Sequence, residues 1–164
     1  MVSRRERGES LPQPRYLRVG IMLGRDEIAK LIEDWLEAWN RHDLAGVLHR
    51  MADDIVFEHW NARVTHGKAQ LERLWRPWFA AHGNFRFTLK SLCVDQKEQS
   101  CTFEWSLAWP SPEPNFRGAA ENREGIDVIR FRNGEIATKR SYISAVITID
   151  GRAIPLTCLN PSAD

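Results

Sequence analysis

The sequence lacks the cysteine patterns that hold many small domains together. Its 164 residues contain only three cysteines, Cys93, Cys101 and Cys158, an odd number with no Cys-x-x-Cys spacing. This excludes a disulfide framework and gives no support to a zinc site. A reduced, cytoplasmic protein is expected.

Long apolar runs and a strong excess of one charge are also missing. The longest apolar candidate, Tyr142 to Ile149, is interrupted by Ser144 and Thr148 and is far shorter than the ~18 residues of a membrane helix. The formal net charge is only +1, which argues against a strongly basic nucleic-acid binder. We therefore expect neither a membrane nor nucleic acid as a partner.

Motifs for cofactors and metals are absent as well. The chain has no Gly-x-Gly-x-x-Gly, no P-loop and no Gly-x-Ser-x-Gly sequence, and no two histidines have metal-site spacing. The sequence thus predicts no metal and no cofactor.

The amino-terminal segment differs in charge from the rest. Residues 1–25 hold six arginines against two glutamates, a net +4, which leaves −3 for the remainder of a chain with a total of +1. With Pro12, Pro14 and little apolar periodicity, residues 1–24 are predicted to be a disordered basic leader. One domain is expected over residues 25–160. An alternative is that Met22 is the natural start.

Apolar spacing of three and four predicts three helices in the first half. The first begins with Asp26 as its cap and runs to Trp39; the second spans residues 44–51; the third spans residues 71–79, with Pro77 expected to kink or break it. A spacing of two then predicts strands. These cover residues 55–60, 85–94, 101–109, 123–132, 135–149 and 152–159, and a proline-rich loop at 110–118 needs no fixed structure.

The order of these elements predicts an α+β fold. A cone-shaped, curved and mostly antiparallel sheet would wrap around the three helices of the N-terminal half. Such a shape leaves a cavity in which a small ligand can bind.

Two titratable residues interrupt apolar strand faces and are candidates for chemistry. His59 shares a face with Ile55 and Phe57, where burial would suit an imidazole to proton transfer; the alternative is a structural histidine. Asp127 shares a face with Ile129 and Phe131, so it needs a buried partner or a ligand unless it faces solvent.

The hairpin after Asp127 has two readings. With Asn133 and Gly134 as a two-residue turn, Asp127 lies opposite Arg140 and its face includes Tyr142. With a three-residue bulged turn, Asp127 lies opposite Lys139 and its face includes Ser141. The sequence leaves open which basic residue faces the cavity.

Four sequence strings carry a resemblance to a known superfamily. They are Trp39-Asn-Arg-His-Asp43, Ala52-Asp-Asp-Ile-Val-Phe-Glu58, His66-Gly-Lys-Ala69 and Gly125-Ile-Asp-Val-Ile-Arg-Phe131. Over residues 26–159 the chain resembles the nuclear-transport-factor-2-like superfamily, especially its SnoaL-like and ketosteroid-isomerase-like branch. The resemblance implies a cystatin-like α+β roll with a pocket, and a homodimer formed through the sheet.

The resemblance also implies roles for individual residues. The steroid isomerases of this superfamily use a carboxylate base, a tyrosine and a protonated aspartate; their pattern places His59, Trp35 and Asp127 at these positions. The resemblance also implies which residues line the pocket, namely Phe57, Cys101, Phe103, Trp105, Leu107, Arg123 and Ile129. Arg123 would pair with Asp127 or lie at the rim. Because Trp35 is not a phenol, the resemblance supports a pocket more than the isomerase reaction.

Two functions remain as hypotheses. The first is a cofactor-independent isomerase or cyclase that acts on a small apolar carbonyl compound, with His59 as base and Asp127 orienting it or binding the oxyanion. The second is a ligand-binding or dimerisation module of the same fold without turnover. A subunit that docks another protein has no distinctive support in the sequence.

Overall fold

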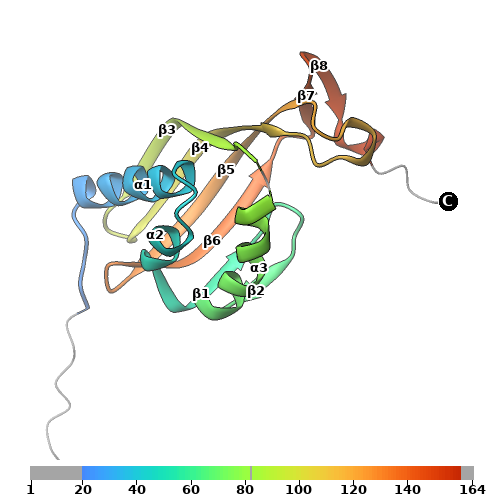
Figure 1. Cartoon of the computed structure of the whole chain (residues 1–164). Coiled ribbons are helices and arrows are strands. Elements are labelled where there is room, and N and C mark those ends of the chain that lie inside the picture. The colour runs from blue at the N-terminus through green and yellow to red at the C-terminus, as the bar shows by residue number, and fades with distance from the viewer. Residues whose placement is uncertain (1–19, 82, 160–164) are drawn as a thin grey trace, which may run out of the picture.

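A computed structural model describes residues 20–81 and 83–159, and it confirms the predicted α+β fold (Figure 1). The helices are α1 (Arg25–Asn40), α2 (Leu44–His49) and α3 (Lys68–Ala81). The strands are β1 (Met51–Glu58), β2 (Val64–His66), β3 (Arg86–Asp95), β4 (Ser100–Pro110), β5 (Ala120–Arg132), β6 (Glu135–Ile143), β7 (Val146–Ile149) and β8 (Arg152–Pro155). Most of the predicted leader, residues 1–19, lies outside the described residues, as does His82.

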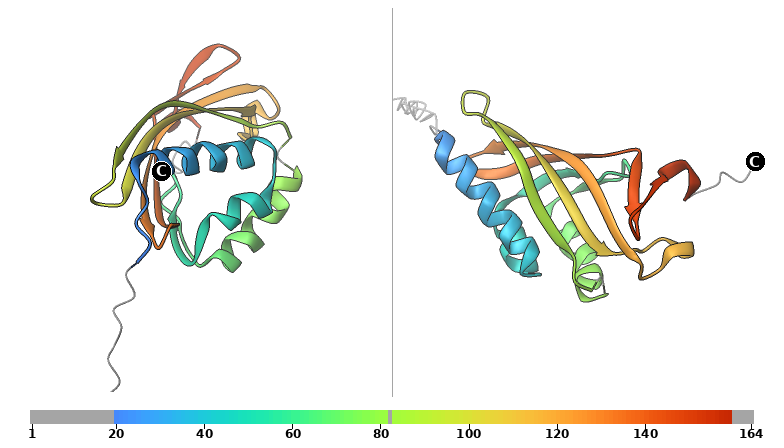
Figure 2. Two further views of the ribbon diagram at one scale, coloured as in Figure 1. Left: turned by 90° about the vertical axis from the view of Figure 1, so that its left-hand side faces the viewer. Right: turned by 90° about the horizontal axis from the view of Figure 1, so that it is seen from above.

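The strands form one curved sheet with the helices on its concave side (Figure 2). The order is β2-β1-β6-β5-β4-β3, and the pairs along it are antiparallel except for the parallel pair β1–β6. The short β7–β8 hairpin extends from the start of β5. The parallel pair joins the N-terminal half of the chain to its C-terminal half.

Helix α1 supplies the centre of the core through one apolar stripe. Ile28, Ile32 and Trp35 are almost fully buried against the sheet. The helix begins one residue before the predicted cap: Gly24 is the N-cap, and its N–H donates to the Glu27 carboxylate at 2.7 Å. A carboxylate three residues into the helix therefore does the capping that Asp26 was expected to do.

Helix α3 continues through Pro77, so the expected break is absent. Pro77 and Arg73 both lie on the exposed face of the helix. The Arg73 carbonyl that loses its helical donor can therefore be satisfied by water.

The predicted strand over residues 135–149 is two strands rather than one. β6 ends at Ile143 and β7 begins at Val146, and both pair with β5 at different places along its length. The chain bends between them, where the Ser144 N–H donates to Glu124 and the Ala145 carbonyl accepts from Leu156. The last predicted strand is also shorter, because residues 156–158 form a 3-10 turn.

The proline-rich loop has a defined structure, contrary to expectation. The Ser111 N–H donates to Ala119 and the Gly118 N–H donates to Ser111, which closes the loop at its base. Residues 114–116 add a turn of 3-10 helix. Local hydrogen bonds thus order a segment whose composition suggested no fixed structure.

Candidate functional site

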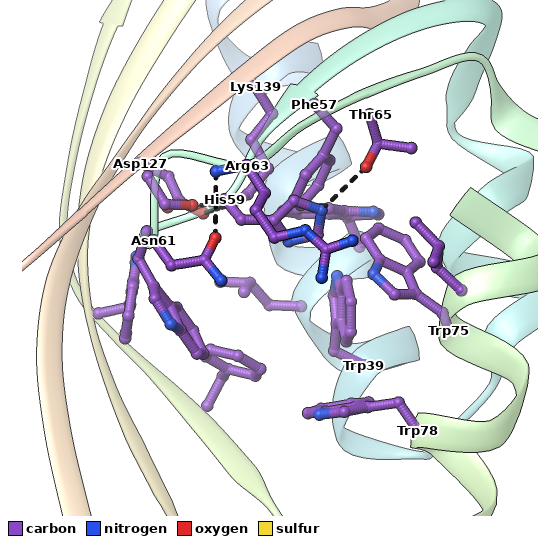
Figure 3. Close-up of a pocket in the computed structure, with 17 residues that line it drawn as sticks. Trp39, Phe57, His59, Asn61, Arg63, Thr65, Trp75, Trp78, Asp127 and Lys139 are labelled. Carbon is purple, nitrogen blue, oxygen red and sulfur yellow. Dashed lines mark hydrogen bonds and ion pairs between the residues drawn. The ribbon is translucent and has the colours of Figure 1, made fainter. Parts of the chain in front are cut away.

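A cavity of about 280 Å³ lies between the concave face of the sheet and the helices (Figure 3). Its wall is largely aromatic and includes six of the seven tryptophans: Trp35, Trp39, Trp60, Trp75, Trp78 and Trp105, with Phe57 and Phe87. The polar lining side chains are His59, Asn61, Arg63, Thr65, Asp127, Lys139 and Ser141. An apolar wall with a few grouped polar atoms is typical of a small-molecule site.

His59 lies just beyond the end of β1 and lines the cavity. Its backbone N–H donates to Arg63 at 2.9 Å, its Nε2 lies 3.3 Å from the Thr65 hydroxyl, and its ring lies 4.6 Å from the Phe57 ring. Burial lowers the pKa of His59 to about 4, and the positive charges of Lys139 and Arg63 add to this effect. The imidazole is therefore neutral near pH 7.

Asp127 and Lys139 form a buried ion pair on neighbouring strands. The Asp127 Oδ2 lies 2.8 Å from the Lys139 Nζ, and the two side chains are only 6% and 7% exposed. Lys139 also donates to the Ser141 hydroxyl and lies 4.5 Å from the centre of the Phe57 ring. Figure 3 shows both side chains at the sheet side of the cavity.

One oxygen of Asp127 is left without a partner. Among the described residues, its Oδ1 is fully buried and receives no hydrogen bond. A buried carboxylate oxygen in this state is costly unless a ligand or water donates to it.

A second buried polar atom of the lining also lacks a partner in the described part of the chain. It is the indole Nε1 of Trp105, an N–H donor. Trp105 pairs with Gly125 and so lies on the same sheet face as Asp127, one step diagonally along the strands. A side chain at Gly125 would collide with the Trp105 ring, so the glycine permits the ring to cover that strand.

The turn before Lys139 explains why this residue faces inward. Asn133 and Gly134 both have positive φ and form a two-residue turn, so Arg132 lies opposite Glu135. Ala137 then bulges out of β6, which places Ser141 opposite Asp127 and puts Lys139 on the same face. Arg140 points outward and pairs with Glu58 at 2.6 Å.

Neither predicted reading of this hairpin is right as a whole. The turn has two residues, as in the first, but Asp127 shares its face with Ser141, as in the second. A bulge inside the strand carries no turn residue and so has no signal in the sequence, and the choice between Lys139 and Arg140, left open above, falls on Lys139.

Comparison with known proteins identifies the family. A model of the SnoaL-like domain matches residues 32–139, more than half of the chain. The chain belongs to the SnoaL-like domain family. A search of curated proteins finds no match.

Solved structures share the fold of this SnoaL-like domain at low identity. A candidate polyketide cyclase from Xanthomonas campestris is 18% identical with a TM-score of 0.62, over 73% of this chain and 92% of that one. AclR, a candidate hydroxylase from Streptomyces galilaeus, is 18% identical with a TM-score of 0.63, over 84% and 98%. An NTF2-like protein from Exiguobacterium is 14% identical with a TM-score of 0.59, over 70% and 98%.

The residues predicted for the site divide into two groups in the SnoaL-like domain. Trp35, Phe57, His59, Trp105 and Asp127 line the cavity. Phe103, Arg123 and Ile129 are not among the described residues that line it. Phe103 and Ile129 are instead buried in the core.

Trp35 lines the cavity, but its N–H is already used. The indole Nε1 donates to the Val47 carbonyl at 3.2 Å, which ties α1 to α2. Trp35 therefore contributes its ring to the wall of the cavity, while its N–H is engaged within the fold.

Arg123 pairs with two glutamates rather than with Asp127. It contacts Glu121, which is fully buried, and lies 2.5 Å from Glu113 in the proline-rich loop. Its guanidinium also lies over the rings of Trp60 and Trp109. Arg123 thus lies beside the site and contacts Trp60, which lines it.

Two further findings concern the described residues alone. No three His, Cys, Asp or Glu side chains gather there as a metal ion would require. No helix in that part of the chain is long and apolar enough to cross a membrane.

Proposed function

We propose that this SnoaL-like domain binds a small, largely apolar carbonyl compound and catalyses proton transfer on it, as a cofactor-independent isomerase or cyclase. The observation that carries the proposal is that two buried atoms, the Trp105 N–H and the Asp127 Oδ1, have no hydrogen-bond partner within residues 20–81 and 83–159. One is a donor and the other an acceptor, and both belong to side chains that line the aromatic cavity.

An acceptor and a donor are the two groups that an enolisation requires, one to remove a proton from carbon and one to stabilise the carbonyl oxygen. The Asp127 carboxylate, which pairs with Lys139 at 2.8 Å, takes a proton from the carbon next to the carbonyl. The Trp105 N–H donates to the carbonyl oxygen as negative charge develops on it. The protonated Asp127 carboxyl then returns the proton at another carbon, which restores the carboxylate, and His59, neutral and near the Thr65 hydroxyl, lines the cavity beside the ligand. This assignment makes Asp127 the first base, because its Oδ1 is a buried acceptor without a hydrogen-bond partner among the described residues, whereas the His59 Nε2 lies 3.3 Å from the Thr65 hydroxyl.

The fold of the candidate polyketide cyclase supports the reaction class, since ring closure in a polyketide also begins with removal of a proton beside a carbonyl. The cavity volume of about 280 Å³ restricts the ligand to a compact molecule.

The test is exchange of carbon-bound hydrogen. Cyclohexanone and 2-tetralone are incubated with the protein in D₂O, and loss of the α-proton signal is followed by NMR. We expect Asp127→Asn to slow enzyme-dependent exchange by about 100-fold or more. The matched Asp26→Asn, on the exposed start of α1, is expected to leave it unchanged.

A ligand-binding module without turnover is the second candidate. It is favoured by the low pKa of His59 and by the use of the Trp35 N–H within the fold. Quenching of tryptophan fluorescence by either ketone without any exchange would establish this alternative and overturn catalysis.

We also propose that the domain is a homodimer in the cytoplasm. Ile126 and Tyr142 face each other on the convex side of the sheet and are 38% and 52% exposed, which provides an apolar patch for pairing. The three cysteines are free thiols, as a reducing compartment would keep them.

A further inference from the structure

Lys139 is placed where lysines are rarely found. Its side chain is 7% exposed, it lies against the face of the Phe57 ring, and it is part of the cavity wall. Lysine is almost never buried without a specific partner. The partner here, Asp127, is itself an element of the proposed site.

We infer that Lys139 is a nucleophile: its Nζ condenses with the carbonyl carbon of an aldehyde or ketone held in the cavity and forms a Schiff base. The inference deepens the proposed function and rests on it in one respect, because a carbonyl compound must enter the cavity.

The surroundings of the Nζ act on its pKa in opposite directions, with a net lowering. Burial lowers the pKa of Lys139, and the neighbouring Asp127 opposes this shift. The other charged or titratable groups lining the cavity are His59, just beyond β1, and Arg63, just before β2. A lysine desolvated in an apolar pocket is a recognised form of activated amine.

A route for the proton is already in place. The Asp127 Oδ2 lies 2.8 Å from the Nζ and can take the proton that the ammonium must lose. The free amine then forms a bond from nitrogen to the carbonyl carbon, while the carbonyl oxygen gains a proton to give a carbinolamine. The carbon–oxygen bond breaks with release of water, and the product is a protonated imine.

The charge balance of this step suits the buried site. The ammonium and the carbonyl compound give the iminium and one water, so the total charge of +1 is unchanged and no oxidant or reductant is needed. The iminium stays beside the Asp127 carboxylate, which avoids an uncompensated buried charge. Trp105, whose N–H has no hydrogen-bond partner among the described residues, belongs to the same cavity wall.

The test is reductive trapping with benzaldehyde and sodium cyanoborohydride at pH 7. Intact mass gives the number of benzyl groups added, and peptide mapping locates them. We expect one group on Lys139, added at least tenfold faster than on Lys90, an exposed lysine of β3. Labelling of Lys90 as fast as Lys139 would contradict the inference.

Two variants separate covalent capture from a structural role. Lys139→Arg keeps a cation beside Asp127 but cannot form an imine, so trapping at this position should be lost while circular dichroism shows a folded protein. Lys90→Met, the matched control, should retain trapping on Lys139. If Lys139→Arg does not fold, excess toluene is used with the unaltered protein. Toluene fills the cavity without condensing, and it should slow labelling of Lys139 but not of Lys90.

Tryptophan fluorescence distinguishes failure of the inference from failure of the proposed function. Benzaldehyde that quenches the fluorescence but leaves Lys139 unlabelled binds without condensing, which overturns the nucleophilic lysine alone. Neither quenching nor labelling means that the cavity does not admit a carbonyl compound, and both proposals then fall.

Discussion

At the scale of single residues, burial acts in the same direction on the two basic side chains of the cavity. The pKa values of His59 and Lys139 are both lowered, because the apolar wall disfavours the charged form of each. Lys139 has a carboxylate within 2.8 Å to oppose the effect, whereas His59 has only the Thr65 hydroxyl. The same wall therefore gives one neutral imidazole and one paired amine.

The low pKa of His59 predicts a pH dependence of stability. The unfolded histidine has a pKa near 6.5 and the folded one a pKa of about 4, so the unfolded chain binds more protons between these values. The contribution of His59 to the free energy of unfolding is therefore complete above pH 6.5 and falls as the pH drops towards 4. Between pH 7 and pH 5, we expect the free energy of unfolding to fall by about 1 kcal/mol less in His59→Gln than in the unaltered protein. The difference is kept this small because solvent reaches part of the His59 ring.

Urea denaturation at the two pH values measures this difference, and His66→Gln is the matched control. His66 is exposed at the end of β2. An NMR titration of His59 with a midpoint near 6.5 would contradict the expected shift directly.

Gly125 provides a second prediction at this scale. In Gly125→Ala the new methyl group must displace the Trp105 ring or the neighbouring strand, which we expect to destabilise the fold by about 1–3 kcal/mol. The displaced indole should also weaken quenching of tryptophan fluorescence by 2-tetralone. Glu124→Ala, at the adjacent exposed position, should change neither stability nor quenching. If Gly125→Ala also leaves both unchanged, the Trp105 ring is not held against this glycine.

At the scale of elements, sequence periodicity predicted the helices and most strands because their apolar spacing reflects one buried face. It also placed His59 and Asp127 on cavity-facing strand positions. The inward position of Lys139 depends on a bulge at Ala137, and the break between β6 and β7 depends on hydrogen bonds to Glu124 and Leu156. These features depend on tertiary contacts, which the spacing of apolar residues along the chain does not predict.

The pairing of Arg123 with Glu113 was beyond prediction, because it depends on how a loop folds back; Glu121, by contrast, lies two residues before Arg123 on the same face of β5. Glu121 accepts from Trp109 at 2.7 Å and from Ser111 at 2.6 Å as well as from Arg123. This buried cluster holds the proline-rich loop against β5.

Removal of Arg123 should therefore be costly. Arg123→Gln leaves Glu121 buried with an uncompensated charge, and we expect a loss of about 3 kcal/mol or more in the free energy of unfolding. Glu113→Gln removes only the partly exposed partner and should cost about 1 kcal/mol. Urea denaturation compares the two, with faster proteolysis within residues 110–118 as a second readout. Equal losses of unfolding free energy in the two variants would show that the buried Arg123–Glu121 pair stabilises the protein no more than the pair with Glu113.

At the scale of the whole molecule, the proposed dimer makes a prediction of its own. Tyr142→Asp places a charge in the exposed patch of the convex face and should convert a dimer into a monomer. Tyr142→Phe keeps the apolar ring and should remain dimeric. Sedimentation velocity measures the mass of each, and an unaltered protein that sediments as a monomer at high concentration would remove this surface from consideration.

The parallel pairing of β1 with β6 also affects how the protein is made. The two strands are separated by most of the domain, and one wall of the cavity is completed only when residues 135–143 have left the ribosome. Until then β3, β4 and β5 can pair but β1 has no β6 to join, so the cavity side of the chain stays open, and exposed apolar surface of this kind promotes aggregation. Pairing between distant segments also slows folding. A nascent chain stalled before residue 135 should thus need chaperone protection that the finished chain does not.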